Sequence, residues 1–250
     1  MTINDVDDVT VKGFKIRALQ PTSHSYCGAS VGIRAIHAKS VSITGNDIGP
    51  SGSGEYCGVS DGIVATAGTT GTVKGNTITG PAAGPGNPSK PSAGIKLVGV
   101  NASTSVRFDT IARFASDIRV QRANGGTIRN NTLTGGQFSL NIGDGDGLSI
   151  YDNTASGATV SGLYVSGPAT GKTDANTASN NNVHDNDFRS DSNGGHFDCK
   201  GYSASVTSSN GNVFADNQGN SSNPIIMCDW ADGPNWHHGA VPRSGSHVMP

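Results

Sequence analysis

An eight-residue frame recurs along the chain and constrains the fold more than any other sequence feature. It reads apolar–x–apolar–x–x–Asn–x–apolar, and some copies enter it at the third position. Seven copies align without gaps: Val9–Ile16, Val41–Ile48, Val73–Ile78, Ile128–Leu133, Leu148–Ala155, Val183–Phe188 and Phe214–Gly219. A degenerate copy at Val106–Arg113, with Ile111 at the Asn position, completes eight frames that recur every 29 residues on average.

Short alternating strands separate these frames. They are centred on Ile33, Ile63, Ile95, Ile118, Phe138, Leu163, Phe197 and Ile226, each bounded by turn residues. Two or three short strands per period of this length describe one coil of a parallel β-helix, in which each coil completes its core by stacking on the next. The recurring Asn suits an inward turn position, where its amide can hydrogen-bond to the Asn above and below.

Composition excludes the main alternatives. Six Leu among 250 residues argue against a helix bundle or a doubly wound α/β fold, which need Leu-rich helical faces. No apolar run is long enough to span a membrane. A net charge of −2 without a Lys/Arg cluster argues against nucleic acid as a partner.

The spacing and the pattern "GI.V … V.I..N.I" resemble the right-handed parallel β-helix proteins of the pectate-lyase-like superfamily, over roughly residues 5 to 230. The resemblance implies an all-β, right-handed, single-stranded parallel β-helix of about eight coils that lacks its N-terminal cap. We assign residues 1–232 to this domain and 233–250 to a C-terminal tail. The superfamily includes polysaccharide lyases, glycosidases, uronate epimerases, phage tailspikes and non-catalytic surface proteins.

The four cysteines form two pairs at equivalent repeat positions. Cys27 and Cys57 lie 30 residues apart in the same local motif, and Cys199 and Cys228 lie 29 apart. A coil spacing of about 4.8 Å falls within the Cα separation of disulfides, about 4.4–6.8 Å. We therefore predict two disulfides, Cys27–Cys57 and Cys199–Cys228, with four free thiols or a zinc site as the alternatives.

Two disulfides imply an oxidising compartment and thus a secreted or extracellular protein. The start, MTINDVDD, has no signal peptide, so we expect upstream sequence with the export signal to be absent from this chain. A complete cytosolic protein is the alternative.

Alternation places a strip of polar residues on the outer face of the first sheet. The first outward row contains Lys96, Arg119, Ser139, Tyr164 and Asp198, and the second contains Gln121, Asn141, Lys200 and Asp229; His196 lies beside the strip. Polar groups at steps of about 4.8 Å suit an extended acidic or neutral polysaccharide. The same residues can also be solvated side chains of an exposed sheet.

Three reactions fit this strip. A lyase needs a base and a group that neutralises the uronate carboxylate, and Arg119, Tyr164 and Lys200 can take these roles. A hydrolase needs two carboxylates, for which Asp198 and Asp229 are candidates. A uronate epimerase adds a second proton donor, such as His196 with Tyr164. We expect Arg119, Tyr164, Asp198 and Lys200 to be catalytic.

The remaining site residues have binding roles. We expect Lys96, Gln121, Asn141, His196 and Asp229 to bind substrate. Asp144 and Asp146 in the loop GDGDG can hold Ca²⁺, although the same sequence suits a tight turn, so calcium is a candidate cofactor only.

None of the motif sets of polygalacturonases or uronate epimerases occurs in the sequence. The leading function is binding and cleavage of an extended polysaccharide, with lyase chemistry ahead of hydrolysis. The alternative is a non-catalytic surface, adhesin or tail-fibre module. No sequence feature predicts the oligomeric state.

Overall fold

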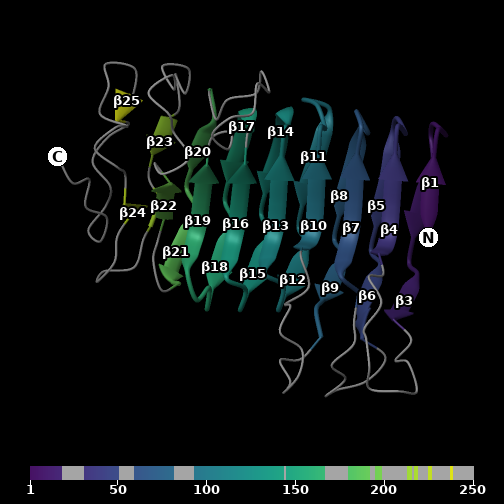
Figure 1. Cartoon of the computed structure of the whole chain (residues 1–250), viewed down its shortest axis with the longest axis horizontal. Helices are drawn as coiled ribbons and strands as arrows, with labels where there is room; N and C mark the ends of the chain where they lie inside the picture. Colours follow the sequence, from purple (N-terminus) through teal and green to yellow (C-terminus); the bar gives the residue numbers. More distant parts are fainter. Residues whose placement is uncertain are drawn as a thin grey trace.

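A computed structural model shows a right-handed parallel β-helix built from three sheets (Figure 1). The structure describes residues 1–18, 31–50, 59–81, 93–143, 145–166, 180–191, 195–198, 213–215, 217–218, 225–226 and 237–238. Each of the first seven coils contributes one strand to sheet A, then one to sheet B, then one to sheet C, and the last two coils contribute described strands to sheets A and B; the strands pair in parallel with the corresponding strands of the neighbouring coils. The predicted fold class is therefore confirmed.

Sheet A contains β1 (Thr2–Asn4), β4 (Val31–Ile36), β7 (Asp61–Thr66), β10 (Ala93–Val98), β13 (Ser116–Gln121), β16 (Phe138–Gly143), β19 (Ser161–Ser166), β22 (Gly195–Asp198) and β24 (Ile225–Ile226). Sheet B contains β2 (Thr10–Lys12), β5 (Val41–Thr44), β8 (Gly71–Lys74), β11 (Thr104–Arg107), β14 (Asn124–Arg129), β17 (Asp146–Tyr151), β20 (Asn182–His184), β23 (Val213–Ala215) and β25 (His237–His238). Sheet C contains β3 (Lys15–Ala18), β6 (Asp47–Pro50), β9 (Thr77–Thr79), β12 (Thr110–Ala112), β15 (Thr132–Thr134), β18 (Thr154–Ser156) and β21 (Asp187–Ser190).

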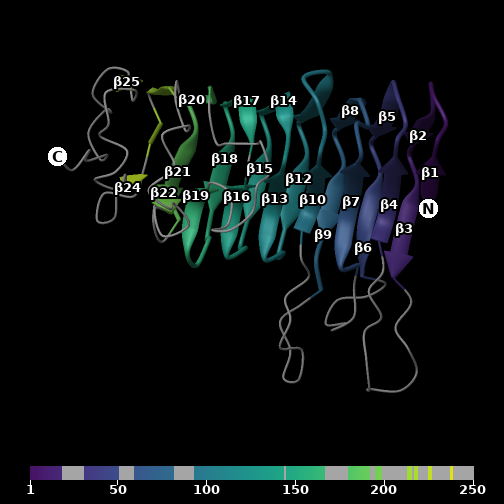
Figure 2. The same ribbon diagram turned by 45° about the horizontal axis from the view of Figure 1, so that its top comes forward.

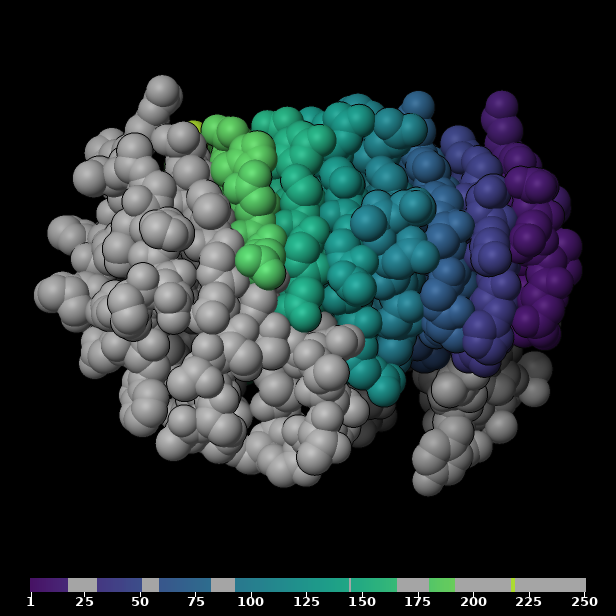
Figure 3. Space-filling model, turned by 90° about the horizontal axis from the view of Figure 1, so that it is seen from above, coloured from purple at the N-terminus to yellow at the C-terminus, as the bar shows by residue number. Residues whose placement is uncertain are grey.

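The coils stack along the long axis of the molecule (Figure 2), and the space-filling view shows them as neighbouring bands in sequence order (Figure 3). Among the described residues, sheets A and B each have nine strands. Strand β1 precedes the first frame found in the sequence. Strand β25 pairs with β23, so pairing continues into the segment assigned to a C-terminal tail. No helix in the described part of the chain is long and apolar enough to cross a membrane.

The core consists of columns of β-branched and Leu side chains, one residue from each coil. In sheet A, Ile63, Ile95 and Ile118 are directly paired and fully buried. Sheets B and C add similar columns, which include Val106 and Ile111. Full burial of one such side chain contributes about 1.5–3 kcal/mol, so a narrow core suffices when every coil shares it.

The Gly that precedes the core Ile in several sheet A strands is required by close packing. A Cβ atom on Gly62 would lie 2.4 Å from Ile78 Cγ2 in sheet C and 2.5 Å from the carbonyl oxygen of Gly94 on the next coil. The recurrent Gly-Ile pair therefore marks a point where sheet A packs against sheet C too closely for a Cβ atom.

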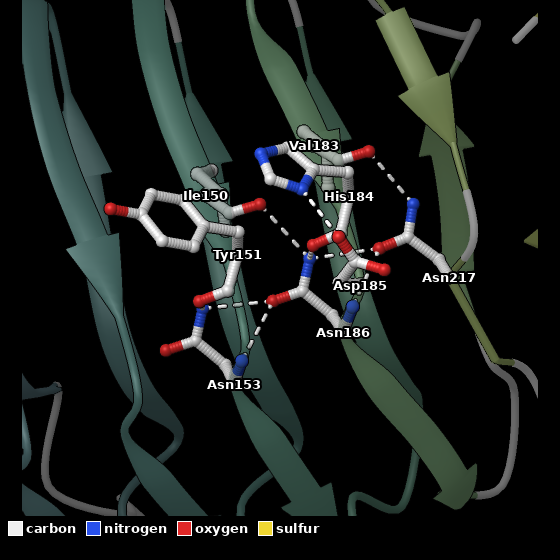
Figure 4. A network of polar contacts seen from close by, with 8 residues as sticks. All are labelled: Ile150, Tyr151, Asn153, Val183, His184, Asp185, Asn186 and Asn217. Carbon is white, nitrogen blue, oxygen red and sulfur yellow. Dashed lines mark hydrogen bonds and ion pairs between the residues drawn. The ribbon is translucent and has the colours of Figure 1, made fainter.

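A ladder of buried side chains runs along the turn between sheets B and C. It contains Asn46, Asn76, Asp109, Asn131, Asn153, Asn186 and Asn217, each at most 3% exposed. Asn131 Nδ2, for example, donates to Asn153 Oδ1 at 2.9 Å. In the next step, which Figure 4 shows, Asn153 Nδ2 donates to Asn186 Oδ1 at 2.8 Å. The predicted Asn ladder is thus confirmed at all six Asn positions of the frame.

The sequence alignment of one coil is wrong. Ile111 was placed at the ladder position, but it pairs with Ile78 and Leu133 in sheet C and is fully buried in the core. Asp109 occupies the ladder instead, two residues earlier. A carboxyl group therefore interrupts a row of amides.

Candidate functional site

Strand pairing in sheet A brings a row of polar residues to its outer face. Lys96 pairs with Arg119, and Arg119 pairs with Asn141. Asn141 pairs with Tyr164, and the backbone register continues from Tyr164 to His196. We call these five residues the sheet A row. Neighbouring positions are one strand spacing apart, about 4.8 Å.

The observed register corrects the predicted row at two strands. Ser139 was expected in the row, but it is fully buried and Asn141 takes that position. Asp198 was expected beside Tyr164, but it pairs with Ser166, and His196 pairs with Tyr164. Both errors are shifts of two residues, which leave each side chain on the same face of the strand, so the apolar pattern fits either register.

Four side chains of the sheet A row, those of Lys96, Arg119, Asn141 and Tyr164, are half-buried, and neighbouring residues support two of them. Asn141 Nδ2 donates to Ser116 Oγ at 3.2 Å, which orients its amide. The ring of Tyr164 lies 4.9 Å from the ring of Phe138, at an angle of 46°. The predicted site contained neither supporting residue, because Ser116 lies three residues before Arg119 and the strand of Phe138 was expected to centre on that residue, whereas Leu140 takes the core position.

The second outward row is less polar than predicted. Gln121 pairs with Gly143, and the register continues to Ser166 and Asp198. Asn141, expected in this row, belongs to the first. The first row alone brings Arg119, Asn141 and Tyr164 together, while Gln121 lies two residues after Arg119 in the second row.

Several predicted site residues lie outside the described residues. These are Lys200, Asp229, Asp144 and the four cysteines, Cys27, Cys57, Cys199 and Cys228. Asp146, the second residue proposed for calcium, is half-buried at the start of β17 in sheet B, where its N–H donates to the carbonyl of Ala123. Asp146 and the sheet A row thus lie on different sheets.

A buried carboxyl group lies next to strand β16. Asp191 is 1% exposed, accepts a hydrogen bond from the Ala158 N–H at 2.7 Å and faces the Ser139 hydroxyl at 3.4 Å. Burial raises the pKa of Asp191 to about 6, against the opposing effect of these two donors. Its main contacts are structural, since they join the end of sheet C to sheet A.

Comparison with known proteins places the chain in a family. Residues 19–233 match the family model described as "NosD: Periplasmic copper-binding protein (NosD)", which covers most of the sequence. The chain belongs to the NosD family. No curated protein matches the sequence of this NosD family member.

Solved structures confirm the architecture. The periplasmic alginate epimerase AlgG superposes with a TM-score of 0.64 at 14% identity, over 90% of this chain and 47% of that one. A single-substitution mutant of AlgG gives a TM-score of 0.61 at 13% identity, over 86% of this chain and 45% of that one. The NosD family member thus spans less than half the length of these structures, and at this identity the likeness shows the fold alone.

The family description raises the question of a copper site. Within the described ranges, no three His, Cys, Asp or Glu side chains lie together in a group that could hold a metal ion. His184 stacks on Tyr151 and contacts Asp185, and His37 faces Asp5. The described donors therefore do not fit copper.

Proposed function

We propose that this protein binds an extended acidic polysaccharide along the outer face of sheet A and abstracts the C5 proton of a uronate residue. The sheet A row carries this proposal, because it aligns two cations, an amide and a phenol on consecutive strands. A polysaccharide chain parallel to the helix axis would meet one of these groups at each step of about 4.8 Å. The resemblance to a periplasmic alginate epimerase in fold is consistent with such a substrate.

Each group of the row has a chemical role. The C5 proton is acidic only when the adjacent carboxylate is neutralised, and the Arg119 guanidinium can do this with two parallel hydrogen bonds. Asn141, held by Ser116, donates to the same developing negative charge. Tyr164 and His196, at adjacent register positions, are the candidates for the base and the acid.

Two products can follow from this first step. Loss of the C4 substituent from the carbanion gives an unsaturated sugar, which is the lyase outcome that we favour. Return of a proton to the opposite face of C5 gives an epimer. Hydrolysis is less well supported, because it needs two carboxylates and none of the five residues of the sheet A row is an Asp or a Glu.

Activity measurements on two variants test this site. Arg119→Gln and Tyr164→Phe should each lower turnover of a polyuronate by about a hundredfold or more, the range typical for loss of an electrostatic or acid–base group. Turnover is followed by the ultraviolet absorbance of unsaturated products and by the ratio of the two uronate epimers. The control variant Arg113→Gln also removes one positive charge, at an exposed residue after β12, and should leave turnover unchanged.

Activity that survives both Arg119→Gln and Tyr164→Phe would place the reaction elsewhere. Tight binding of the polymer by wild-type protein without any chemical change would support the non-catalytic module instead.

We further propose an extracytoplasmic location, supported by the word "periplasmic" in the family description and in both structural relatives. The predicted disulfides Cys27–Cys57 and Cys199–Cys228 fit such a compartment. Thiol titration of unreduced protein in denaturant should then find no free thiol. Four reactive thiols would contradict both disulfides and remove the chemical argument for export.

A further inference from the structure

A row of cationic and aromatic side chains runs along the outer face of sheet B. Lys74 pairs with Arg107, and Arg107 pairs with Arg129. The row continues through Tyr151 to His184, whose rings stack with centroids 5.0 Å apart and planes at 4°. Phe108 follows Arg107 in the chain. We call these six residues the sheet B stripe.

The three cations of the stripe, Lys74, Arg107 and Arg129, are adjacent, and none of them forms an ion pair with a carboxylate of the described residues. Like charges directly opposite each other on neighbouring strands are destabilising. In the part of the chain that the structure describes, the ion pairs involve other residues: Arg17–Asp47, His37–Asp5, His184–Asp185 and Arg189–Asp187. Arg107 Nε is buried, with no hydrogen-bond partner among the described residues. An anionic ligand would relieve this repulsion.

Phe108 is the most unusual member of the stripe. It has a φ of 57° and is 49% exposed. The equivalent turn positions hold Gly13, Gly45, Gly75, Asn130, Asp152 and Asp185, all residue types that tolerate left-handed backbone angles. A bulky aromatic residue in this conformation is strained and gains little burial, so folding does not account for it.

The cations hold the aromatic rings in place. Lys74 Nζ lies 5.9 Å from the centre of the Phe108 ring, and Arg129 Cζ lies 5.6 Å from it. Arg129 Cζ is also 5.8 Å from the centre of the Tyr151 ring. Aromatic faces beside cations offer stacking for sugar rings together with charge pairing for their carboxylates or sulfates.

We propose that the sheet B stripe is a second binding surface for an acidic polysaccharide, separate from the sheet A row. The stripe follows the helix axis with one group for each coil, which suits a linear polymer of charged sugars. Nucleic acid is the other polyanion, but the chain has a net charge of −2 and lacks the basic excess of nucleic-acid-binding domains. Asp152 and Asp185 in the adjoining turn add negative charge at the margin.

The test measures affinity in the Arg119→Gln background, so that sheet A chemistry does not consume the ligand. The probes are polygalacturonate, alginate and hyaluronate at low salt, with dextran as the neutral control. The double variant Lys74→Gln/Arg129→Gln should lower the affinity for the best acidic probe by about tenfold or more, as expected for the loss of two charged contacts. Lys15→Gln, an exposed cation on sheet C, should have no effect.

A second variant separates binding from folding. Phe108→Gly places at this turn the residue found at three equivalent positions, so its melting temperature should equal or exceed that of the parent. Its affinity should nevertheless fall by about tenfold, because the stacking platform is lost.

Three outcomes would overturn the proposal: no binding of any acidic probe, unchanged affinity in either stripe variant, or equally strong binding of dextran. The proposal would also be overturned if single-stranded DNA bound more tightly than the acidic polysaccharides and if the double variant lost this binding. The stripe would then be assigned to nucleic acid. The sheet A reaction is judged separately, by the turnover of wild-type and stripe variants on short oligouronates.

Discussion

Asp109→Asn should stabilise the protein by about 3 kcal/mol at pH 8, since that is the free energy equivalent of the upward shift in the pKa of Asp109. Burial raises this pKa from 3.8 to about 6, although the Asn76 N–H and side-chain amide donate to the carboxyl and oppose the shift. Asp109 Oδ2 is buried with no hydrogen-bond partner among the described residues. An Asn at this position would restore the amide donor that its neighbours in the ladder have.

The pH dependence has a defined sign. Because the pKa of Asp109 is higher in the folded than in the unfolded protein, its contribution to stability is fully present below pH 3.8 and is lost as the pH rises through about 6. Protonated Asp109 can donate a hydrogen bond, as an amide does, whereas the ionised form cannot. The wild type should therefore lose stability between about pH 4 and pH 7, and Asp109→Asn should lose less.

Urea unfolding at several pH values measures this effect. Asp191 has a pKa raised to about 6 by the same cause, so Asp109→Asn keeps the part of the dependence that comes from Asp191. The matched variant Asp152→Asn changes an exposed carboxyl in the neighbouring turn and should alter stability by less than about 0.5 kcal/mol. Equal stability of Asp109→Asn and wild type at pH 8 would show that Asp109 is not buried in the ladder as described.

Asn153→Ala should destabilise the protein by about 3–5 kcal/mol, because several buried groups lose their partners together. Asn153 Oδ1 accepts from the N–H and the Nδ2 of Asn131, and Asn153 Nδ2 donates to the carbonyl of Ile128. Asn153 Nδ2 also donates to Asn186 Oδ1 (Figure 4). The variant should unfold at a markedly lower urea concentration.

The control for this variant is Asn182→Ala, which removes an exposed Asn side chain from the outer face of sheet B. It should shift the free energy of unfolding by less than about 0.5 kcal/mol. If Asn153→Ala and Asn182→Ala were equally mild, the ladder would not be a main determinant of coil stacking.

The fold could be predicted from the sequence because the same residue types recur at the same positions of successive coils. The ladder Asn recurs in most coils because its amide bonds to the amide above and below it, and the Gly beside the core Ile recurs in several coils because a Cβ atom there would clash. The degenerate coil shows the limit of this reading. Asp109 replaces the marker residue, and the alignment therefore moved to Ile111, two positions away.

The candidate site could be predicted only in part, because the alignment of some coils was uncertain by two residues. A shift of two residues preserves the alternation of inward and outward side chains, so the pattern cannot distinguish Asn141 from Ser139 or His196 from Asp198 as neighbours of Tyr164. Only the pairing of whole strands fixes which polar groups are adjacent. The sheet B stripe was not predicted, because its cations are 22 to 33 residues apart in sequence. They form a row only through the pairing of the sheet B strands.

The proposed chemistry predicts one direct observable, which is the fate of the C5 hydrogen of a uronate. Polygalacturonate and alginate are incubated with the protein in D₂O, and the H5 signal is followed by NMR. Wild-type protein should deplete the H5 signal of its substrate, with a vinyl signal if elimination follows and an altered epimer ratio if reprotonation follows. Arg119→Gln should deplete it about a hundredfold more slowly. An H5 signal that stays intact while the polymer is cleaved, or depletion that Arg119→Gln leaves unchanged, would contradict proton abstraction at the sheet A row.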